Sequence, residues 1–504
     1  MKQWKLAGST AVIAILAGTG AFAEVTPEEV WQNWQDLSAS YGQTVTATSA
    51  ERDGDTLVVS GVTISQDKDG VAVSGSIDEL NFTDNGDGSV DVTMSESYPL
   101  LVVLPADDGA EPVDLKITLT QPDMVITASG TADALSYDFE APTMVAKLEA
   151  INGVDASRVD ATAEATLTNM TGSYLVEGDG EAKNITSDFA AESVKLVMSG
   201  TDDEAKSAVN LTASIANLAS NSTGTFLGAE AMVDFAAALK AGFAVNGNVS
   251  YGATSFDVAI TEAGAPSKVS GTLGGGDISF AMDANHMQYG GAGKAVAVSI
   301  TSPDIPFPEL KMAYEEAAFN FLMPVAKTDA PSDFALLTKL VGLTVSDEVW
   351  GMFDPAGNLP RDPATVVIDT KGKVKLTTDL LDEAAMAAIG ETPPGELHAL
   401  DITEIKASIA GAELTGNGAL TFDNSDLTTF QGMPVPTGKV DLKLVGGSGL
   451  LDKIVAMGLM TQDDAMGFKM MVSMFANSAP DKDEMTSTLE FKDKGFYANG
   501  QRLQ

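Results

Sequence analysis

The chain has 504 residues, of which 71 are acidic and 29 are basic, and its formal net charge is −42. This charge repels the phosphates of nucleic acids and the headgroups of anionic lipids, so the composition excludes nucleic acid as a partner of the bulk surface. Cysteine is absent, which excludes disulfides, thiol catalysis, thiolate metal sites and a lipoprotein anchor.

The first 23 residues have the pattern of a cleaved secretory signal peptide. Lys2 and Lys5 precede an apolar stretch from Leu6 to Leu16, and Ala21-Phe22-Ala23 matches an A-x-A cleavage site. Glycines interrupt the apolar stretch, which is too short to span a bilayer. We therefore expect residues 1–23 to be removed, and the mature chain to be periplasmic and not an integral membrane protein.

The segment 24–43 is predicted to form a helix. Thr26 is a typical N-cap residue, Pro27 occupies the first helical position, and Glu29 lies three residues after the cap. Apolar residues recur at helical spacing along the segment, namely Val30, Trp31, Trp34 and Leu37. We expect this helix to cover the end of a sheet.

In the segment 44–304 the apolar residues recur with a period of two, which is typical of β-strands. Asp-Gly and Asn-Gly pairs separate the strand-like runs, and these pairs tolerate the positive φ that tight hairpin turns require. The first such pairs are Asp53-Gly54, Asp69-Gly70, Asn85-Gly86 and Asp87-Gly88. This half of the chain is predicted to be an antiparallel β-meander.

Residues 305–504 are predicted to form a second β half with helical insertions. Short helices are expected from Asp333 to Val341 and from Ser346 to Phe353, and two strands around a turn at Lys371-Gly372. A helical hairpin is expected near the C-terminus, with helices from Leu450 to Met457 and from Ala465 to Phe475.

These patterns together predict a mainly β, α+β fold. Its body is expected to be a long curved antiparallel β-meander, with covering helices mainly in the C-terminal half. In the run from Lys439 to Leu444, Val440 and Leu442 alternate with charged residues. This alternation indicates a sheet with one buried face and one wet face.

Five short stretches of the C-terminal half carry a family resemblance. They are Val349 to Pro355, Leu359 to Ala364, Ala410 to Gly418, Gly449 to Lys453 and Ala498 to Arg502. In these stretches the chain resembles the alphaproteobacterial family called domain of unknown function 2125. The similarity is close over residues 305–504 and diffuse before them. The resemblance implies an exported protein without an established activity or a catalytic motif.

Side chains suited to catalysis or metal binding are sparse. Histidine occurs only at His286 and His398, and the chain has neither an H-E-x-x-H motif nor a G-x-S-x-G elbow. The run from Asp84 to Asp91 clusters oxygen ligands, but its spacing fits a hairpin turn better than an EF-hand calcium loop. We therefore predict no catalytic residue, no metal site and no cofactor, and we interpret the chain as a non-enzyme.

Arg361 is a candidate anion-binding residue. Its guanidinium can bind a carboxylate or a phosphate with a bidentate geometry that lysine lacks. The alternative is a structural ion pair with Asp354 or Asp362 that holds the adjoining turn.

A methionine stripe is the candidate ligand-binding feature of the predicted helical hairpin. Met466, Met470 and Met474 recur at i, i+4 and i+8, so they share one helix face. Thioether side chains adapt their shape and suit variable apolar ligands. The alternative is that this face packs onto the sheet.

The leading functional hypothesis is a non-enzymatic periplasmic binding or scaffold protein with a groove for a lipid or another apolar ligand. Export, the meander, the methionine stripe and the missing catalytic groups motivate it. The alternative is a structural component of the envelope that binds partner proteins and holds no small ligand. A hydrolase with a convergent nucleophile and base is the least favoured function.

Overall fold

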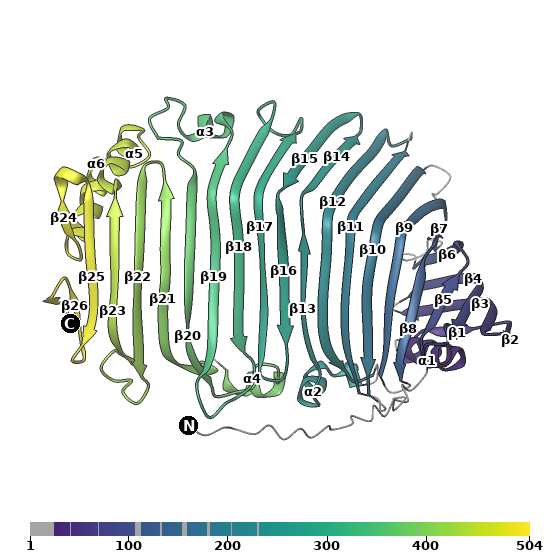
Figure 1. Ribbon diagram of the computed structural model, residues 1–504. Coiled ribbons are helices and arrows are strands. Elements are labelled where there is room, and N and C mark those ends of the chain that lie inside the picture. Colours follow the sequence, from purple (N-terminus) through teal and green to yellow (C-terminus); the bar gives the residue numbers. More distant parts are fainter. Residues whose placement is uncertain are drawn as a thin grey trace, which may run out of the picture.

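The computed structural model describes residues 25–504 apart from residues 41, 69, 106–111, 132–133, 154–158, 179–181, 203, 229–230 and 391. The predicted signal peptide, residues 1–23, lies outside the described residues. The described chain forms one sheet of 27 strands, arranged as a long curved antiparallel meander (Figure 1).

The N-terminal part of the sheet contains several long strands that are interrupted midway. Both β5 and β6 pair with β4, and both β7 and β8 pair with β9, so each pair forms the two halves of one interrupted strand. The strands are β1 (Thr44–Thr46), β2 (Ser49–Asp53), β3 (Thr56–Lys68), β4 (Val71–Asp84), β5 (Val90–Met94), β6 (Ser97–Leu104), β7 (Val113–Thr120), β8 (Val125–Thr131) and β9 (Ala134–Asn152).

The middle of the sheet contains the longest strands, and pairing continues without a break across residues 304 and 305, where the two predicted halves meet. Both β13 and β14 pair with β12, and both β15 and β16 pair with β17. The strands are β10 (Val159–Glu177), β11 (Lys183–Asp202), β12 (Ser207–Phe226), β13 (Ala244–Tyr251), β14 (Thr254–Glu262), β15 (Ala265–Leu273), β16 (Gly275–Met282), β17 (His286–Thr301) and β18 (Leu310–Pro324).

The C-terminal part continues the same up-and-down order as far as β25, and the short strands β24 and β26 pair with the outer side of β25. The strands are β19 (Ser332–Val345), β20 (Ala364–Leu376), β21 (Gly395–Ile409), β22 (Ala412–Asp423), β23 (Val435–Val445), β24 (Asn477–Ala479), β25 (Glu484–Lys492), β26 (Gly495–Ala498) and β27 (Gln501–Arg502).

The helices confirm the predicted fold class, because most of those in the described chain belong to its C-terminal half. In Figure 1, α2 and α4 lie at one set of strand ends, and α3, α5 and α6 lie at the other. The helices are α1 (Pro27–Ser40), α2 (Phe235–Lys240), α3 (Asp347–Phe353), α4 (Glu383–Ile389), α5 (Gly447–Ala456) and α6 (Gln462–Ser473).

Hydrogen bonds confirm the predicted helix cap at Thr26 and show a second cap at Thr461. The Thr26 amide donates to Glu29 Oε2 at 2.9 Å, and the Glu29 amide donates back to Thr26 Oγ1 at 3.3 Å. At the start of α6 the Asp464 amide donates to Thr461 Oγ1 at 3.1 Å. Side-chain oxygens therefore satisfy amides that the first turn of each helix leaves without an intrahelical partner.

Two local predictions in the C-terminal half are wrong. Asp333 to Val341 is part of β19 instead of a helix, because Phe334, Leu336 and Leu340 share one face of a strand that pairs on both sides. Lys371-Gly372 is not a turn, because β20 continues straight through it. Gly372 instead lies directly opposite Phe334 on the neighbouring strand.

The main hydrophobic core lies at the N-terminal end of the sheet, beneath α1. Val30 of α1 and Phe82, Val90 and Val92 of the strands are fully buried there. The Trp34 ring packs edge-on against Phe82, with 5.4 Å between the ring centroids. The prediction that this helix covers the end of a sheet is confirmed.

The hydroxyl of Tyr137 fixes the far side of α1 to β9. It is buried and donates to Asn33 Oδ1 at 2.7 Å. Burial raises the pKa of Tyr137, so the phenol stays protonated and remains a donor. This hydrogen bond orients α1 on the sheet, and because it is made, the buried hydroxyl is not left without a partner.

Candidate ligand-binding surface

Strand register separates the sheet into two chemically different faces. One row of directly paired residues crosses nine successive strands as Ser187, Ser222, Gly247, Phe280, Tyr289, Phe321, Leu336, Thr370 and Ile402. The next row crosses the same strands as Asp188, Asn221, Asn248, Ser279, Gly290, Asn320, Leu337, Asp369 and Glu404. Paired residues share a face and consecutive residues point to opposite faces. We call the face of Phe321 the apolar face and the face of Asn320 the polar face.

The apolar face continues across a line of interrupted pairings. Asn169, Asn217 and Ala295 adopt a positive φ of 48°, 52° and 50°, and the ladder skips a residue at each of them. Beyond the interruption Leu167 and Val194 pack against a small buried cluster of Ala141, Met170 and Ala191, on the same side as before. The alternation therefore shifts by one residue, and the apolar face extends to both ends of the long strands.

Most of the apolar face between the two ends of the sheet is open. The side chains of Phe280, Phe321, Leu336 and Tyr289 are 36%, 37%, 44% and 49% exposed. Contiguous exposed apolar surface is unusual in proteins and marks interaction or ligand-binding surfaces. The combination of an uncharged row and partly exposed aromatic rings makes this region the candidate ligand-binding surface.

The helices of the described residues cover the apolar face only near its two ends. At the N-terminal end α1 seals the core described above. At the C-terminal end a cavity of about 330 Å³ lies between α6 and the sheet, lined by Leu444, Met471, Phe475 and Leu489 among others. A second apolar cavity of about 430 Å³ lies over β7 and β9 to β12. The lining of the first cavity includes no charged residue, and that of the second includes Glu164.

A further cavity, of about 670 Å³, lies along the middle strands of the sheet. Its lining combines polar-face residues such as Thr212, Ser270 and Ser299 with apolar-face residues such as Phe256, Val298 and Met312. Asp257 in its wall binds Lys268 at 2.7 Å.

The methionine stripe of α6 points away from the sheet. Met466, Met470 and Met474 are 57%, 66% and 61% exposed, so the alternative that they pack onto the sheet is wrong. The residues of α6 that approach the sheet are instead Met471 and Val472. Binding of an apolar ligand by the stripe stays a prediction.

Arg361 forms an ion pair, although neither of the two expected aspartates is its direct partner. Its guanidinium binds Asp347, the first residue of α3. Asp354 is fully buried and accepts the amides of Leu359 at 2.7 Å and Asn358 at 2.8 Å. These backbone hydrogen bonds, Leu359 first, and the nearby Arg361 charge lower the pKa of Asp354. The arrangement holds the turn between α3 and β20, and anion binding by Arg361 stays a prediction.

The two histidines lie apart and each faces a single carboxylate. His286 Nδ1 is 3.0 Å from Asp283, and His398 Nε2 is 3.4 Å from Glu396. In the run from Asp84 to Asp91 the carboxylate of Asp87 accepts the Ser89 hydroxyl at 2.6 Å, and the run forms the predicted turn between β4 and β5. Within the described ranges, three or more metal-ligating side chains do not gather at any point.

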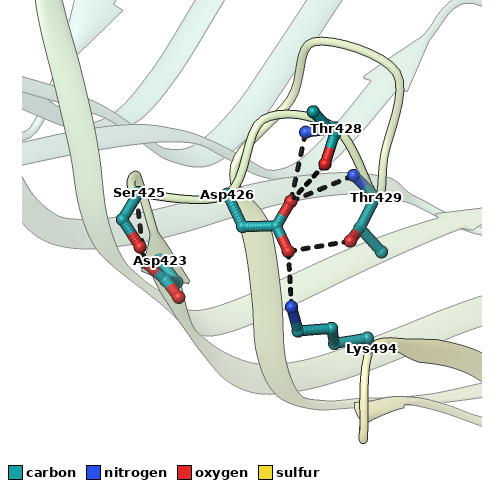
Figure 2. A network of polar contacts seen from close by, with 6 residues as sticks. All are labelled: Asp423, Ser425, Asp426, Thr428, Thr429 and Lys494. Carbon is teal, nitrogen blue, oxygen red and sulfur yellow. Dashed lines mark hydrogen bonds and ion pairs between the residues drawn. The ribbon is translucent and has the colours of Figure 1, made fainter.

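A polar network at the C-terminal end joins two loops (Figure 2). Asp426 binds Lys494 at 2.7 Å, and it also accepts the amides and hydroxyls of Thr428 and Thr429. The Lys494 ammonium, then these donors, lower the pKa of Asp426. Each charge has its partner, so the network is structural and ties the loop after β22 to the loop after β25.

Comparison of the chain with protein-family models, with curated proteins and with solved structures finds no match in any of the three. The resemblance to the family called domain of unknown function 2125 therefore stays a prediction. The described residues also form no helix whose length and hydropathy would let it cross a lipid bilayer.

Proposed function

We propose that the chain is a non-enzymatic binding protein of the bacterial cell envelope, exported by its signal peptide, that holds a lipid or lipid-like molecule on the apolar face. The observation that carries the proposal is the uncharged row containing Phe280, Tyr289, Phe321 and Leu336, whose side chains remain partly exposed. Covering apolar surface gains roughly 25 cal/mol per Å² removed from water, so a ligand on this face gains free energy.

The distribution of charge supports the same proposal. Acidic and basic side chains of the central strands, such as Asp369, Lys371 and Glu404, lie on the polar face. A large negative charge keeps the chain dispersed in water, while the row from Ser187 to Ile402 on the opposite face contains no charged residue. The apolar part of an amphiphile fits the uncharged row, and its polar part would lie at the edge of the apolar face, in water.

Extraction of the purified protein with organic solvent, followed by mass spectrometry, tests this proposal. We expect a bound lipid or lipid-like molecule in repeated preparations. Leu336→Gln and Leu337→Gln form a matched pair of variants, because the two leucines are adjacent and lie on opposite faces. We expect the first to weaken binding about tenfold, since burying a leucine contributes roughly 1.5 kcal/mol or more, and the second to leave it unchanged.

Two outcomes would contradict the proposal. One is the repeated absence of any extractable ligand. The other is an equal effect of the two leucine variants on binding. The competing function, a structural protein that holds no small ligand, predicts instead that crosslinking in cells yields specific protein adducts on the apolar face.

A further inference from the structure

Six glycines of the apolar face lie directly beneath an aromatic ring of the neighbouring strand. The register places them opposite one another as Phe139 with Gly172, Tyr251 with Gly276, Phe256 with Gly271, Phe280 with Gly247, Phe319 with Gly291, and Phe334 with Gly372. A Cβ atom at any of these glycines would lie between 2.3 and 3.1 Å from an atom of the opposite aromatic side chain. The rings therefore occupy the space that a side chain at each glycine would fill.

This contact fixes how far the rings rise above the sheet. A ring that rests on a glycine lies down across the neighbouring strand, whereas a ring beside a larger residue must stand up from the sheet. The Tyr289 and Phe319 rings, whose centroids are 5.1 Å apart, continue the same layer. The pairs thus give the apolar face a low floor of aromatic carbon in place of projecting side chains.

The pairs occur where no helix of the described chain covers the sheet. They extend from β9 to β20, whereas α1 packs at the N-terminal end and α6 lies over β22 to β25. Besides aromatic residues such as Tyr289 and Phe321, which have no glycine opposite them, this part of the apolar face contains the six pairs. Their position indicates a role in shaping the open surface, since the covered ends are filled by ordinary core packing.

We propose that these glycines are the specificity-determining residues of the apolar face, and that they keep its floor low enough for an unbranched acyl chain to lie across the strands. This inference rests on the proposed function. The row from Gly247 to Leu336 crosses four interstrand spacings of about 4.8 Å, or roughly 19 Å, without a charged side chain. Such a path suits an extended hydrocarbon chain.

The test measures binding of cis-parinarate, a fluorescent polyene fatty acid, to the full-length mature protein. In Gly247→Ala the new methyl group would meet the Phe280 ring at 2.5 Å and push it up from the floor. We expect binding about tenfold weaker, a change of about 1.4 kcal/mol. In the double variant Gly247→Ala/Phe280→Leu a flexible side chain replaces the ring, and we expect binding within roughly twofold of wild type.

Two further variants serve as a repeat and as a control. Gly271→Ala and the double variant Gly271→Ala/Phe256→Leu repeat the design on β14 and β15. If circular dichroism shows that Gly247→Ala does not fold, these two variants replace the Gly247 variants. Gly290→Ala is the matched control, because Gly290 lies on the polar face of β17, where its Cβ would meet side-chain oxygens of Asn320 and Ser279 at 3.1 Å and the Phe319 carbonyl oxygen at 3.4 Å, but no aromatic ring. We expect the control to bind like wild type.

The outcomes separate this inference from the proposed function. If the wild-type protein does not bind cis-parinarate, an acyl-chain ligand is excluded and the proposed function loses its main support. If wild type binds and folded Gly247→Ala or Gly271→Ala binds equally well, the role of the glycines is wrong and the proposed function stands. Weaker binding that the leucine substitution does not restore would also overturn the inference.

Discussion

The N-terminal end and the middle of the apolar face carry the same kinds of residue in very different surroundings. At the N-terminal end Phe82 is fully buried beneath Trp31 and Trp34 of α1. In the middle of the sheet, Phe321 and Leu336 are 37% and 44% exposed. The strands and their alternation are alike, so the difference comes from the covering helix alone.

This contrast shows that apolar alternation identifies a face but does not tell whether that face is core or site. At the N-terminal end α1 of the same chain covers the apolar face, so folding itself buries this surface. Between β12 and β21 the described chain supplies no cover, so the same surface is left for something else to bind. The first prediction therefore compares stability at the two places.

Phe82→Ala should have the largest effect on folding. Removing a fully buried phenylalanine costs roughly 3–5 kcal/mol, because the lost transfer free energy adds to a cavity. Phe321→Ala should cost less than about 1.5 kcal/mol, because its ring is already partly in water. Urea unfolding of the ligand-free variants gives both values. Equal losses would mean that the middle of the apolar face is covered in solution.

The C-terminal end offers a smaller version of the same comparison within α6 and the residues just after it. Phe475, which follows α6, lines the cavity between α6 and the sheet and is 36% exposed, whereas Met470 of the methionine stripe is 66% exposed. We expect Phe475→Ala to destabilise the fold by roughly 1–2 kcal/mol and Met470→Ala to cost less than about 0.5 kcal/mol. Thermal unfolding followed by circular dichroism measures both. A larger loss for Met470→Ala would show that the stripe packs against something in the folded protein.

Low pH should destabilise the C-terminal end of the sheet more than the N-terminal end, and we expect this effect to be smaller than the previous ones. Burial raises the pKa of Asp483, but the amides of Gly449 and Ser448 at the start of α5 donate to it and lower the pKa overall. The pKa of Asp426 is lowered as well, chiefly by Lys494. A carboxyl with a lowered pKa contributes stability above its unfolded pKa, about 3.9, and this stability is lost as the pH falls through its folded pKa.

Pepsin digestion below about pH 4 checks this expectation. The α5 to α6 hairpin and the loop after β22 should be cleaved before the strands under α1, whose core depends on apolar burial. Asp483→Asn at neutral pH should already loosen α5 towards thermolysin, because a neutral amide binds the helix amides more weakly. Earlier cleavage of the N-terminal strands would contradict the comparison.

The elements themselves could be predicted from local chemistry. The cap at Thr26, the turn at Asn85-Gly86 and the alternation around Val440 each depend on residues close in sequence, and each prediction is confirmed. The errors have the same origin. The run from Asp333 to Val341 is predicted as a helix, yet in β19 its adjacent Leu336 and Leu337 face different sides of the sheet.

The candidate site could not be predicted in the same way, because it depends on register. Gly372 follows a lysine and has the local signature of a turn, and only its position opposite Phe334 explains it. Likewise Phe280, Tyr289 and Phe321 come from three strands, and pairing alone brings them into one row. The spacing of Phe319 and Phe321 was the one available signal in the sequence.

Photocrosslinking with a diazirine-labelled fatty acid tests the central claim most directly, because it reports which face the ligand touches. Peptide mapping by mass spectrometry should place the adducts on apolar-face residues of β16 to β19, including Phe280, Tyr289, Phe321 and Leu336. Adducts concentrated on the polar face, around Asn320, or an equal yield from both faces would contradict the account.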